Sequence, residues 1–355
     1  LGFSPSRTMG VAQKLYEKGF ITYMRTDSTN MSAQAVAEIA SVITKQFGKD
    51  YLEVRQYKTK SKNAQEAHEA IRPTHASVGH AGATDDEKEL YGLIWGRTLA
   101  SQMSDAKVLR TKISANVVGS KETIPNFSVN GSITLFPGWL LADPDGKGED
   151  VELPALREKD GLKALELRSL QKQTEPPSRY TEAGLVKELE KRGIGRPSTY
   201  ASIISTIEER GYVEKQGKTL FPTDTGDVVS SFLEEHFGKY ISDSFTAEME
   251  DELDEIANGT RTYKKTLEEF YTPFLKDVKE KDKSAGKATD LGKADSSIRC
   301  PICASDMVIK LGKGGKFLSC SRYPECTGAL TLDGQEVGEE KPFTFHPKTG
   351  EAIYL

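Results

Sequence analysis

Four cysteines form the most specific chemical pattern of the sequence. They come as two close pairs, Cys300 with Cys303 and Cys320 with Cys326. Two such turns bring four thiolates to about 2.3 Å from one Zn²⁺, and an ion with all four positions filled would be structural rather than catalytic. The alternative is two disulfides, which the reducing cytosol disfavours in a chain without a secretory signal. The spacing therefore predicts a zinc ribbon.

Basic and aromatic residues lie close to these cysteines in the sequence, among them Lys310, Lys316, Phe317 and Tyr323. This mixture suits phosphate contact combined with base stacking. The ribbon is therefore a candidate for binding single-stranded nucleic acid.

A tyrosine two residues from an arginine is the second candidate site. Tyr23 and Arg25 follow an apolar, β-prone run, Phe20-Ile21-Thr22. A phenol with a pKa of about 10 is a poor nucleophile at neutral pH unless a cation and a polarised phosphate are close. Alone, the pair does not establish catalysis, because tyrosines that hydrogen-bond within a core are common.

A histidine within residues 65–73 is the third candidate. His68 and Arg72 are four residues apart and would share one face if the stretch is helical. Histidine has an ordinary pKa near neutrality, which suits proton transfer. A structural role for His68 is the alternative.

The elements that would position these residues are mainly helical. The first apolar stripe is formed by Val11, Ala12, Leu15 and Tyr16. Gly19 is expected to end this helix, and residues 20–24 are expected to form a strand that carries Tyr23.

A second helical segment precedes Gly193, which takes the position of a helix C-cap. Its apolar stripe is formed by Leu185, Val186 and Leu189. Ser198 is the expected N-cap of the next helix, which Gly211 ends. The buried face of that helix is formed by Tyr200, Ile203, Ile204 and Ile207. Residues 212–221 predict two strands around a turn at Gln216-Gly217, which completes a winged helix-turn-helix layout.

Two local strings resemble one another. Residues 16–21 resemble residues 208–213, and each string is followed by a Thr-Asp-hydroxyl step. Our hypothesis is two related helix-plus-hairpin folds. The alternative is that a helix, a glycine and a strand often follow one another.

The remaining patterns divide the chain into six parts of a multidomain mixed α/β protein. Short alternating runs broken by prolines predict a β-rich segment, and a later run of Lys, Asp, Ser, Ala and Gly predicts a flexible linker. The expected parts are a helical domain with Tyr23 (1–107), the β-rich arch (108–175), a helical winged-helix-like DNA-binding domain (176–278), the linker (279–297), the zinc ribbon (298–332) and the start of a further, truncated module (333–355).

The composition of the 355 residues is that of an ordinary globular protein with a formal net charge of -5. This charge argues against a uniformly basic nucleic-acid coat, although binding depends on local patches. No apolar run approaches the roughly 20 residues of a membrane span, and no signal peptide opens the chain, so we expect a cytoplasmic protein. An opening without Met and an apolar last run suggest a fragment of a longer chain.

Four strings, read together, resemble the bacterial type IA DNA topoisomerase family in the order that the family uses. They are residues 19–28 (GFITYMRTDS), 67–73 (AHEAIRP), 176–183 (PPSRYTEA) and 193–201 (GIGRPSTYA). The resemblance covers residues 1 to about 281, and the cysteine ribbon is similar to the family's first C-terminal zinc module. It implies a clamp of helical domains joined by a β-rich arch around a hole wide enough for DNA.

The resemblance also implies a role for each candidate residue. Tyr23 would attack a DNA phosphodiester and form a 5′-phosphotyrosyl bond, without ATP, and strand passage would relax negatively supercoiled DNA. Arg25 would hold the scissile phosphate, and His68 would contact it or relay a proton. The residues that would grip the single-stranded backbone are Arg196, Ser198 and Thr199, and further candidates for phosphate contact are Lys14, Arg72, Arg192 and Arg210.

The family also uses an N-terminal Toprim domain whose acidic cluster binds Mg²⁺, and this sequence shows no matching acidic strand end. We therefore expect a nucleoid-associated monomer that binds zinc, single-stranded DNA and negatively supercoiled DNA but does not relax DNA alone. One alternative is a noncatalytic DNA-binding module, which leaves Tyr23 and His68 without roles. Another is a structural interaction protein, which would show no salt-sensitive DNA affinity.

Overall fold

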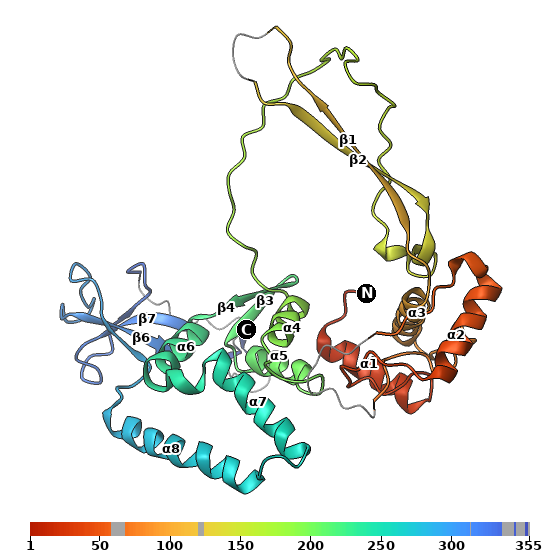
Figure 1. Ribbon diagram of the computed structural model, residues 1–355. Helices are drawn as coiled ribbons and strands as arrows, with labels where there is room; N and C mark the ends of the chain where they lie inside the picture. Colours follow the sequence, from red (N-terminus) through yellow and green to blue (C-terminus); the bar gives the residue numbers. More distant parts are fainter. Residues whose placement is uncertain (58–67, 120–123, 313, 336–343, 346–351, 354–355) are drawn as a thin grey trace. The chain divides into compact units, whose positions relative to one another are not determined.

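Helices and antiparallel strands occur in both compact units of the chain. The computed structural model describes residues 1–57, 68–119, 124–312, 314–335, 344–345 and 352–353. Its contacts divide the chain into Leu1–Ser178 and Arg179–Leu355 (Figure 1). The expected multidomain, mixed α/β class is confirmed, whereas the finer six-part division stays a prediction. Among the helices of the described ranges, none is long and apolar enough to cross a membrane.

Three helices build the core of the first unit: α1 (Pro5–Glu17), α2 (Ala33–Gln46) and α3 (Asp85–Ser101). The residue before each helix accepts a first-turn N–H with its side chain, and these N-caps are Ser4, Ser32 and Thr84. The buried stripe of α1 packs beside α3, where Leu15 and Tyr91 are almost fully buried. The predicted helix that precedes Tyr23 is therefore confirmed, and its core fixes the position where α1 ends.

The prediction of a strand over residues 20–24 is wrong. The segment makes one isolated bridge, between Ile21 and Pro73, and the N–H of Thr22 donates to the carbonyl of Arg72 (2.9 Å). The ladder does not continue because the N–H of Arg72 donates to the Thr22 hydroxyl oxygen (2.9 Å) instead of a backbone carbonyl. The Thr22 hydroxyl thus takes the place of a backbone carbonyl as the acceptor for the Arg72 N–H.

The β-rich segment is confirmed only in its first half. Strands β1 (Lys107–Ala115) and β2 (Phe127–Phe136) form a two-stranded antiparallel ladder (Figure 1). Residues 152–180, all of them described, form no helix or named strand. Their alternating leucines lie exposed, Leu165 at 92%. Alternation alone gave no strand here because no neighbouring strand pairs with the segment within the described part of this unit.

The second unit begins with the predicted helix, helix and hairpin. They are α4 (Glu182–Lys191), α5 (Tyr200–Glu209), β3 (Val213–Gln216) and β4 (Thr219–Pro222). Two details differ from the prediction. Gln216 pairs with Thr219, so the two turn residues are Gly217 and Lys218. Ser198 is not the N-cap of α5; that position belongs to Thr199, whose hydroxyl oxygen accepts the N–H of Arg196 (2.9 Å).

Helices α1, α4 and α5 end in the same way. Gly19, Gly193 and Gly211 adopt φ values of +74°, +72° and +65°, and the next N–H reaches back to the last turn of each helix, from Phe20, Ile194 and Tyr212. This is the Schellman motif, which favours glycine. The hypothesis of a repeat is supported for this cap alone, because a hairpin follows Gly211 but no strand follows Gly19.

Beyond β4, the described residues of the second unit form three α-helices and a four-stranded sheet, together with shorter elements. The helices are α6 (Asp224–Phe237), α7 (Asp243–Ala257) and α8 (Tyr263–Ser284). The sheet has the antiparallel order β5-β6-β7-β8, formed by Asp290–Lys293, Met307–Gly312, Gly315–Cys320 and Ala329–Leu330. Short strands β9 (Thr344–Phe345) and β10 (Ala352–Ile353) pair with each other. The other residues of the expected module from 336 onward lie outside the described ranges.

The prediction of a flexible linker over residues 279–297 is wrong in two places. Helix α8 continues to Ser284, and residues 290–293 form the edge strand β5. The polar composition of residues 279–297 did not reveal β5, because an edge strand needs few apolar side chains. Asp290 pairs with Lys310 and Lys293 with Val308 across the β5–β6 ladder.

Candidate functional site

The structure brings Tyr23 and His68 together. Their ring centroids lie 5.7 Å apart with the planes tilted by 56°. A second phenol, that of Tyr16 on α1, meets the Tyr23 ring edge-on at 5.3 Å. Tyr23 is half-buried between the fully buried Ile21 and Met24, so one side of its ring packs on the α1–α3 core. The phenol is thus held by packing and still partly reached by solvent.

Arg25 lies next to this group and faces solvent. Its side chain is exposed, and it forms no ion pair or hydrogen bond within the described part of the chain. A guanidinium offers a planar fork of donors that matches phosphate oxygens. Tyr23, Arg25 and His68 therefore place a nucleophile, a cation and a proton carrier in one region of the first unit.

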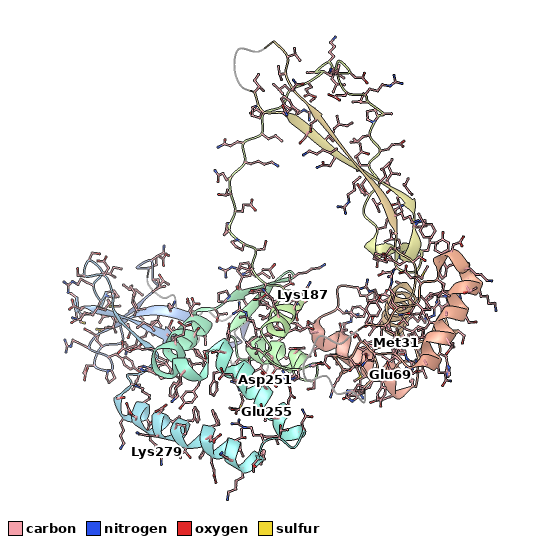
Figure 2. The ribbon with its side chains drawn as sticks, viewed as in Figure 1. Met31, Glu69, Lys187, Asp251, Glu255 and Lys279 are labelled. Atoms are coloured by element: carbon pink, nitrogen blue, oxygen red, sulfur yellow. The ribbon has the colours of Figure 1, made fainter. Side chains whose placement is uncertain are left out.

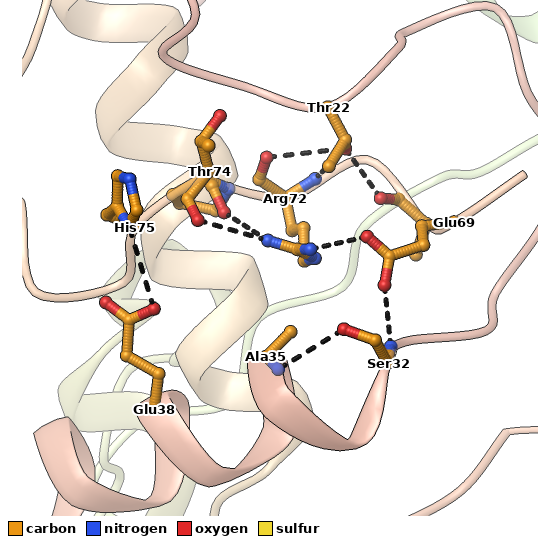
Figure 3. Close-up of polar contacts among 10 residues, drawn as sticks. Thr22, Ser32, Ala35, Glu38, Glu69, Arg72, Thr74 and His75 are labelled. Atoms are coloured by element: carbon orange, nitrogen blue, oxygen red, sulfur yellow. Dashed lines mark hydrogen bonds and ion pairs between the residues drawn. The ribbon is translucent and has the colours of Figure 1, made fainter.

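The segment that carries His68 is irregular, so the expectation of one helical face for His68 and Arg72 is wrong. Residues 68–74 form no helix, and residues 65–67 of that string lie outside the described ranges. The segment is held from the Tyr23 side by Thr22, whose hydroxyl donates to the carbonyl of Ala70 (2.7 Å) while its oxygen accepts the N–H of Arg72 (Figure 3).

Arg72 is engaged inside this segment. Its guanidinium donates to the carboxylate of Glu69 and to the carbonyl of Pro73 (2.9 Å), and its side chain is only 13% exposed (Figure 3). Its Nε is buried without a hydrogen-bond partner. The predicted phosphate contact by Arg72 stays a prediction, and it would require the guanidinium to leave these partners.

Glu69 links the segment to helix α2. One carboxylate oxygen accepts the N–H of Ser32, the N-cap of α2, at 2.7 Å. Burial alone would raise the pKa of Glu69, but hydrogen bonds from Ser32 and Arg72 outweigh it and hold that pKa below its ordinary value. Glu69 is therefore ionised at neutral pH and acts as an anchor for Arg72.

In the second unit, two of the predicted DNA-binding arginines are ion-paired. Arg192 pairs with Glu188 at 2.8 Å and also with Asp243. Arg196 pairs with Asp254 of α7 at 2.6 Å, and its guanidinium also donates to the carbonyl of Gly195. Figure 2 shows the acidic side chains of α7, with Asp251 and Glu255 labelled. DNA would have to compete with these carboxylates.

The protonation of Arg196 follows from the same contacts. Burial lowers the pKa of its guanidinium, but the hydrogen bond and charge of Asp254 outweigh burial and raise that pKa. Arg196 therefore braces the turn between α4 and α5 against α7. The predicted contact of Arg196 with a DNA backbone stays a prediction.

Four other predicted DNA contacts are exposed. Ser198 and Thr199 lie in the turn before α5, Lys14 lies on α1, and Arg210 follows the last residue of α5. Neither Lys14 nor Arg210 forms an ion pair within the described residues. Lys14, Ser198 and Arg210 are therefore open to a ligand, whereas the Thr199 hydroxyl is engaged with the backbone N–H and carbonyl of Arg196. The roles of all four residues stay predictions.

The four cysteine sulfurs converge in the sheet of the second unit. All four lie within 4.8 Å of one another, with Cys300 and Cys326 at 3.6 Å and Cys303 and Cys320 at 3.5 Å. A tetrahedral Zn²⁺ at about 2.3 Å from each sulfur would separate the sulfurs by roughly 3.8 Å, whereas a disulfide needs about 2.05 Å. The site fits a structural zinc ion, as predicted.

The backbone around this site is shaped for the thiolates. A Cβ on Gly328 would collide with the sulfur of Cys300, so only glycine fits there. Hydrogen bonds from Ser305 lower the pKa of Cys303 to about 6, whereas, against the lowering effect of backbone hydrogen bonds, burial and the neighbouring thiols raise the pKa values of Cys320 and Cys326. Within the described residues, no other group of three or more His, Cys, Asp or Glu side chains converges in this way.

Three contributors to the Tyr23 region were missed from the sequence. Thr22 was treated only as part of a β-prone run, Tyr16 only as part of an apolar stripe, and Glu69 was not singled out. Local periodicity cannot reveal these roles, because Thr22 and Glu69 act through contacts with distant parts of the chain. The adjacency of Thr22 to Tyr23 was the one available signal.

Comparisons with known proteins match nearly the whole chain. The profile described as DNA topoisomerase matches residues 1–268, and the profile described as topoisomerase DNA binding C4 zinc finger matches residues 297–334. DNA topoisomerase 1 of Vibrio cholerae is 45% identical over 348 residues, which is 95% of this chain and 39% of that protein. DNA topoisomerase 1 of Escherichia coli (strain K12) is 44% identical over 91% of this chain and 38% of its own length.

A solved structure agrees with these matches. Full-length topoisomerase I from Thermotoga maritima superimposes with a TM-score of 0.72 at 34% identity, over 99% of this chain and 57% of that one. The chain thus spans well under half of the two curated relatives and just over half of the solved one.

Proposed function

The chain belongs to the type IA DNA topoisomerase family, and on that premise we propose that it carries the strand-cleaving side chain of such an enzyme, Tyr23. The observation that supports this most directly is the contact of the Tyr23 phenol with the His68 imidazole beside the exposed guanidinium of Arg25. A noncatalytic DNA-binding module would not need these three groups together.

In the proposed reaction, the Tyr23 oxygen attacks the phosphorus of a single-strand phosphodiester. The bond from phosphorus to the 3′ oxygen breaks, the 3′ hydroxyl leaves with a proton, and Tyr23 retains the 5′-phosphate as an ester. The ester conserves the energy of the broken bond, so religation by the reverse attack needs no ATP. Strand passage between the two steps would relax negatively supercoiled DNA.

Arg25 and His68 divide the remaining tasks. Arg25 would bind the non-bridging phosphate oxygens and stabilise the charge that develops on them. His68 would accept the phenolic proton or pass one to the leaving oxygen, because an imidazole exchanges protons near neutral pH.

Binding of the single strand is assigned to the exposed groups described above. Ser198 and Thr199 would hold backbone phosphates at the turn before α5, and Arg196 would brace that turn or exchange its carboxylates for phosphate. Lys14, Arg72, Arg192 and Arg210 are further candidates. The zinc ribbon would add a second contact with the single strand.

Two further features of the whole enzyme are proposed from the family resemblance. By this resemblance, a Toprim domain would supply the acidic ligands for the catalytic Mg²⁺. A monomer in the bacterial cytoplasm, associated with the nucleoid, is the expected state. On this basis the chain alone binds DNA and zinc but does not relax DNA.

An adduct assay tests the proposal. The chain is mixed with end-labelled single-stranded DNA and Mg²⁺, with and without a Toprim-containing fragment of a relative, and then denatured. We expect label on the protein only with the added fragment, and none with Tyr23→Phe. Tight DNA binding without an adduct under either condition would favour the noncatalytic module.

A further inference from the structure

We propose that Thr22 is a positioning residue that holds the His68 segment against the ring of Tyr23, with Arg72 holding the same segment from its other side. This inference rests on the proposed function of Tyr23. It assigns a role to the Thr22 side chain, which touches neither the phosphate nor the reacting oxygen in the proposed reaction, and to the observed contacts of Arg72 with Glu69 and Pro73.

The first support is the double contact of the Thr22 hydroxyl. It donates to the carbonyl of Ala70 at 2.7 Å, and its oxygen accepts the N–H of Arg72 at 2.9 Å. Both partners belong to the segment that begins at His68. Because Thr22 precedes Tyr23 directly, its backbone cannot shift without moving the phenol.

The second support is the backbone contact on the same stretch. The N–H of Thr22 donates to the carbonyl of Arg72 at 2.9 Å, and Ile21 bridges Pro73. Thr22 therefore exchanges hydrogen bonds with Arg72 in both directions. Two anchors on either side of one residue fix the distance between the two segments better than a single bond would.

The third support is the set of contacts that hold Arg72 in the His68 segment. Arg72 pairs with Glu69, and Glu69 accepts the N–H of Ser32 at the start of α2 (Figure 3). The other terminal nitrogen of the guanidinium donates to the carbonyls of Pro73 (2.9 Å) and Thr74 (3.3 Å). The His68 segment is therefore tied to α2 by Arg72 and Glu69 and to the Tyr23 segment by Thr22.

The consequence concerns the geometry of the ring pair. The two rings make no hydrogen bond with each other, so their 5.7 Å separation depends on the backbone segments that carry them. A proton carrier displaced by about 1 Å can lose roughly 100-fold in rate. Removal of the Thr22 hydroxyl should therefore change the surroundings of His68 and slow cleavage without weakening DNA binding.

The test compares three variants of the chain and uses a fourth to assign the signal of His68. Thr22→Val keeps the shape and removes the hydroxyl, and Thr22→Ser keeps the hydroxyl. Thr8→Val is the matched control, because the Thr8 hydroxyl donates to a backbone carbonyl, that of Ser4, elsewhere in the same unit. The chain is labelled with ¹³C at the ε1 carbon of its five histidines, and His68→Gln assigns the His68 signal.

We expect Thr22→Val to move the His68 signal, because the Tyr23 ring no longer shields it in the same way, while Thr22→Ser and Thr8→Val leave it in place. In the adduct assay, Thr22→Val should be slower by roughly 10- to 100-fold at unchanged DNA affinity, with recovery in Thr22→Ser. An unmoved His68 signal in Thr22→Val, or a Thr22→Ser variant as slow as Thr22→Val, would overturn the inference.

Two safeguards keep the outcomes separate. If Thr22→Val does not fold, Glu69→Gln is used in its place. Glu69→Gln weakens the contact with Arg72 but keeps an acceptor for the N–H of Ser32. The proposal then requires that Glu69→Gln move the His68 signal. If Tyr23→Phe still forms adducts, the proposed function fails, whereas the His68 signal still reports whether Thr22 positions the segment.

Discussion

The rings of Tyr23 and His68 lie with their centroids 5.7 Å apart, although the two residues come from separate segments of the first unit. The contact exists because Thr22 and Arg72 exchange hydrogen bonds between these segments. Arg25 remains exposed beside them. The proposed chemistry uses these three groups, and each can be altered without removing a buried apolar side chain.

Replacing His68 should slow cleavage but not DNA binding. In His68→Gln, the adduct should form roughly 100-fold more slowly when the Toprim fragment is present, because general acid–base catalysis contributes about 10²–10⁴-fold. His75→Gln is the control, since the His75 side chain is 69% exposed and pairs only distantly with Glu38 (3.9 Å). Equal single-turnover rates for the two variants would remove His68 from the mechanism.

The ion pairs of Arg196 should stabilise the second unit. Arg196→Lys keeps the charge but cannot hold Asp254 and the carbonyl of Gly195 with one planar fork. We expect a loss of about 1 kcal/mol in the free energy of unfolding, since the pair is partly exposed. Thermal unfolding followed by circular dichroism measures it, with the exposed Arg210→Lys as control. Equal midpoints for both variants would mean that Arg196 does not brace the turn.

The ribbon should hold one zinc ion. Elemental analysis should find one Zn²⁺ per chain, and all four cysteines of the sequence should resist a thiol reagent until a chelator is added. Cys320→Ser should lose most of the bound zinc, because a buried thiolate ligand is removed. Four reactive thiols in the zinc-loaded protein would contradict the site.

The attachment of the ribbon to α6 should depend on pH. Asp224 at the start of α6 accepts the N–H of Lys316 at 2.9 Å and pairs with its ammonium at 3.3 Å. The backbone hydrogen bond of Lys316 is the main cause of the lowered pKa of Asp224. The pKa of Asp224 is lower in the folded protein than in the unfolded chain, where it is about 4, so the contact is fully stabilising above that pH. This stabilisation is lost as the pH falls through the lower pKa of the folded state.

Amide exchange can follow this contact. In Asp224→Asn, the Lys316 amide should exchange faster at pH 6 to 7, where the wild-type carboxylate is fully ionised. Asp227→Asn on the same helix serves as control, because Asp227 forms no ion pair in the described part of the chain. Unchanged exchange at Lys316 would show that the contact does not hold the ribbon.

Patterns of residue type predicted the parts of the fold that depend on local physics. The apolar stripes found α1, α4 and α5, the glycines marked their ends, and the cysteine spacing gave the metal site. Each of these depends on residues close in sequence, so the expected structure and the observed one agree.

Predictions that required distant partners were less successful. Residues 20–24 are not a strand because the Thr22 hydroxyl takes a backbone donor from Arg72. Residues 290–293 are a strand because β6 offers its edge. The contact of Tyr23 with His68 follows from tertiary packing, and only the family resemblance connected the two residues beforehand.

Mapping the DNA-linked peptide is the most direct test of the central claim. Trypsin should release Tyr23 in a peptide of residues 19–25, where it is the only tyrosine, while Tyr16 falls in residues 15–18. After adduct formation and nuclease digestion, mass spectrometry should find the nucleotide phosphate on residues 19–25. Attachment to residues 15–18, or to any peptide of the second unit, would contradict the assignment of Tyr23 as the nucleophile.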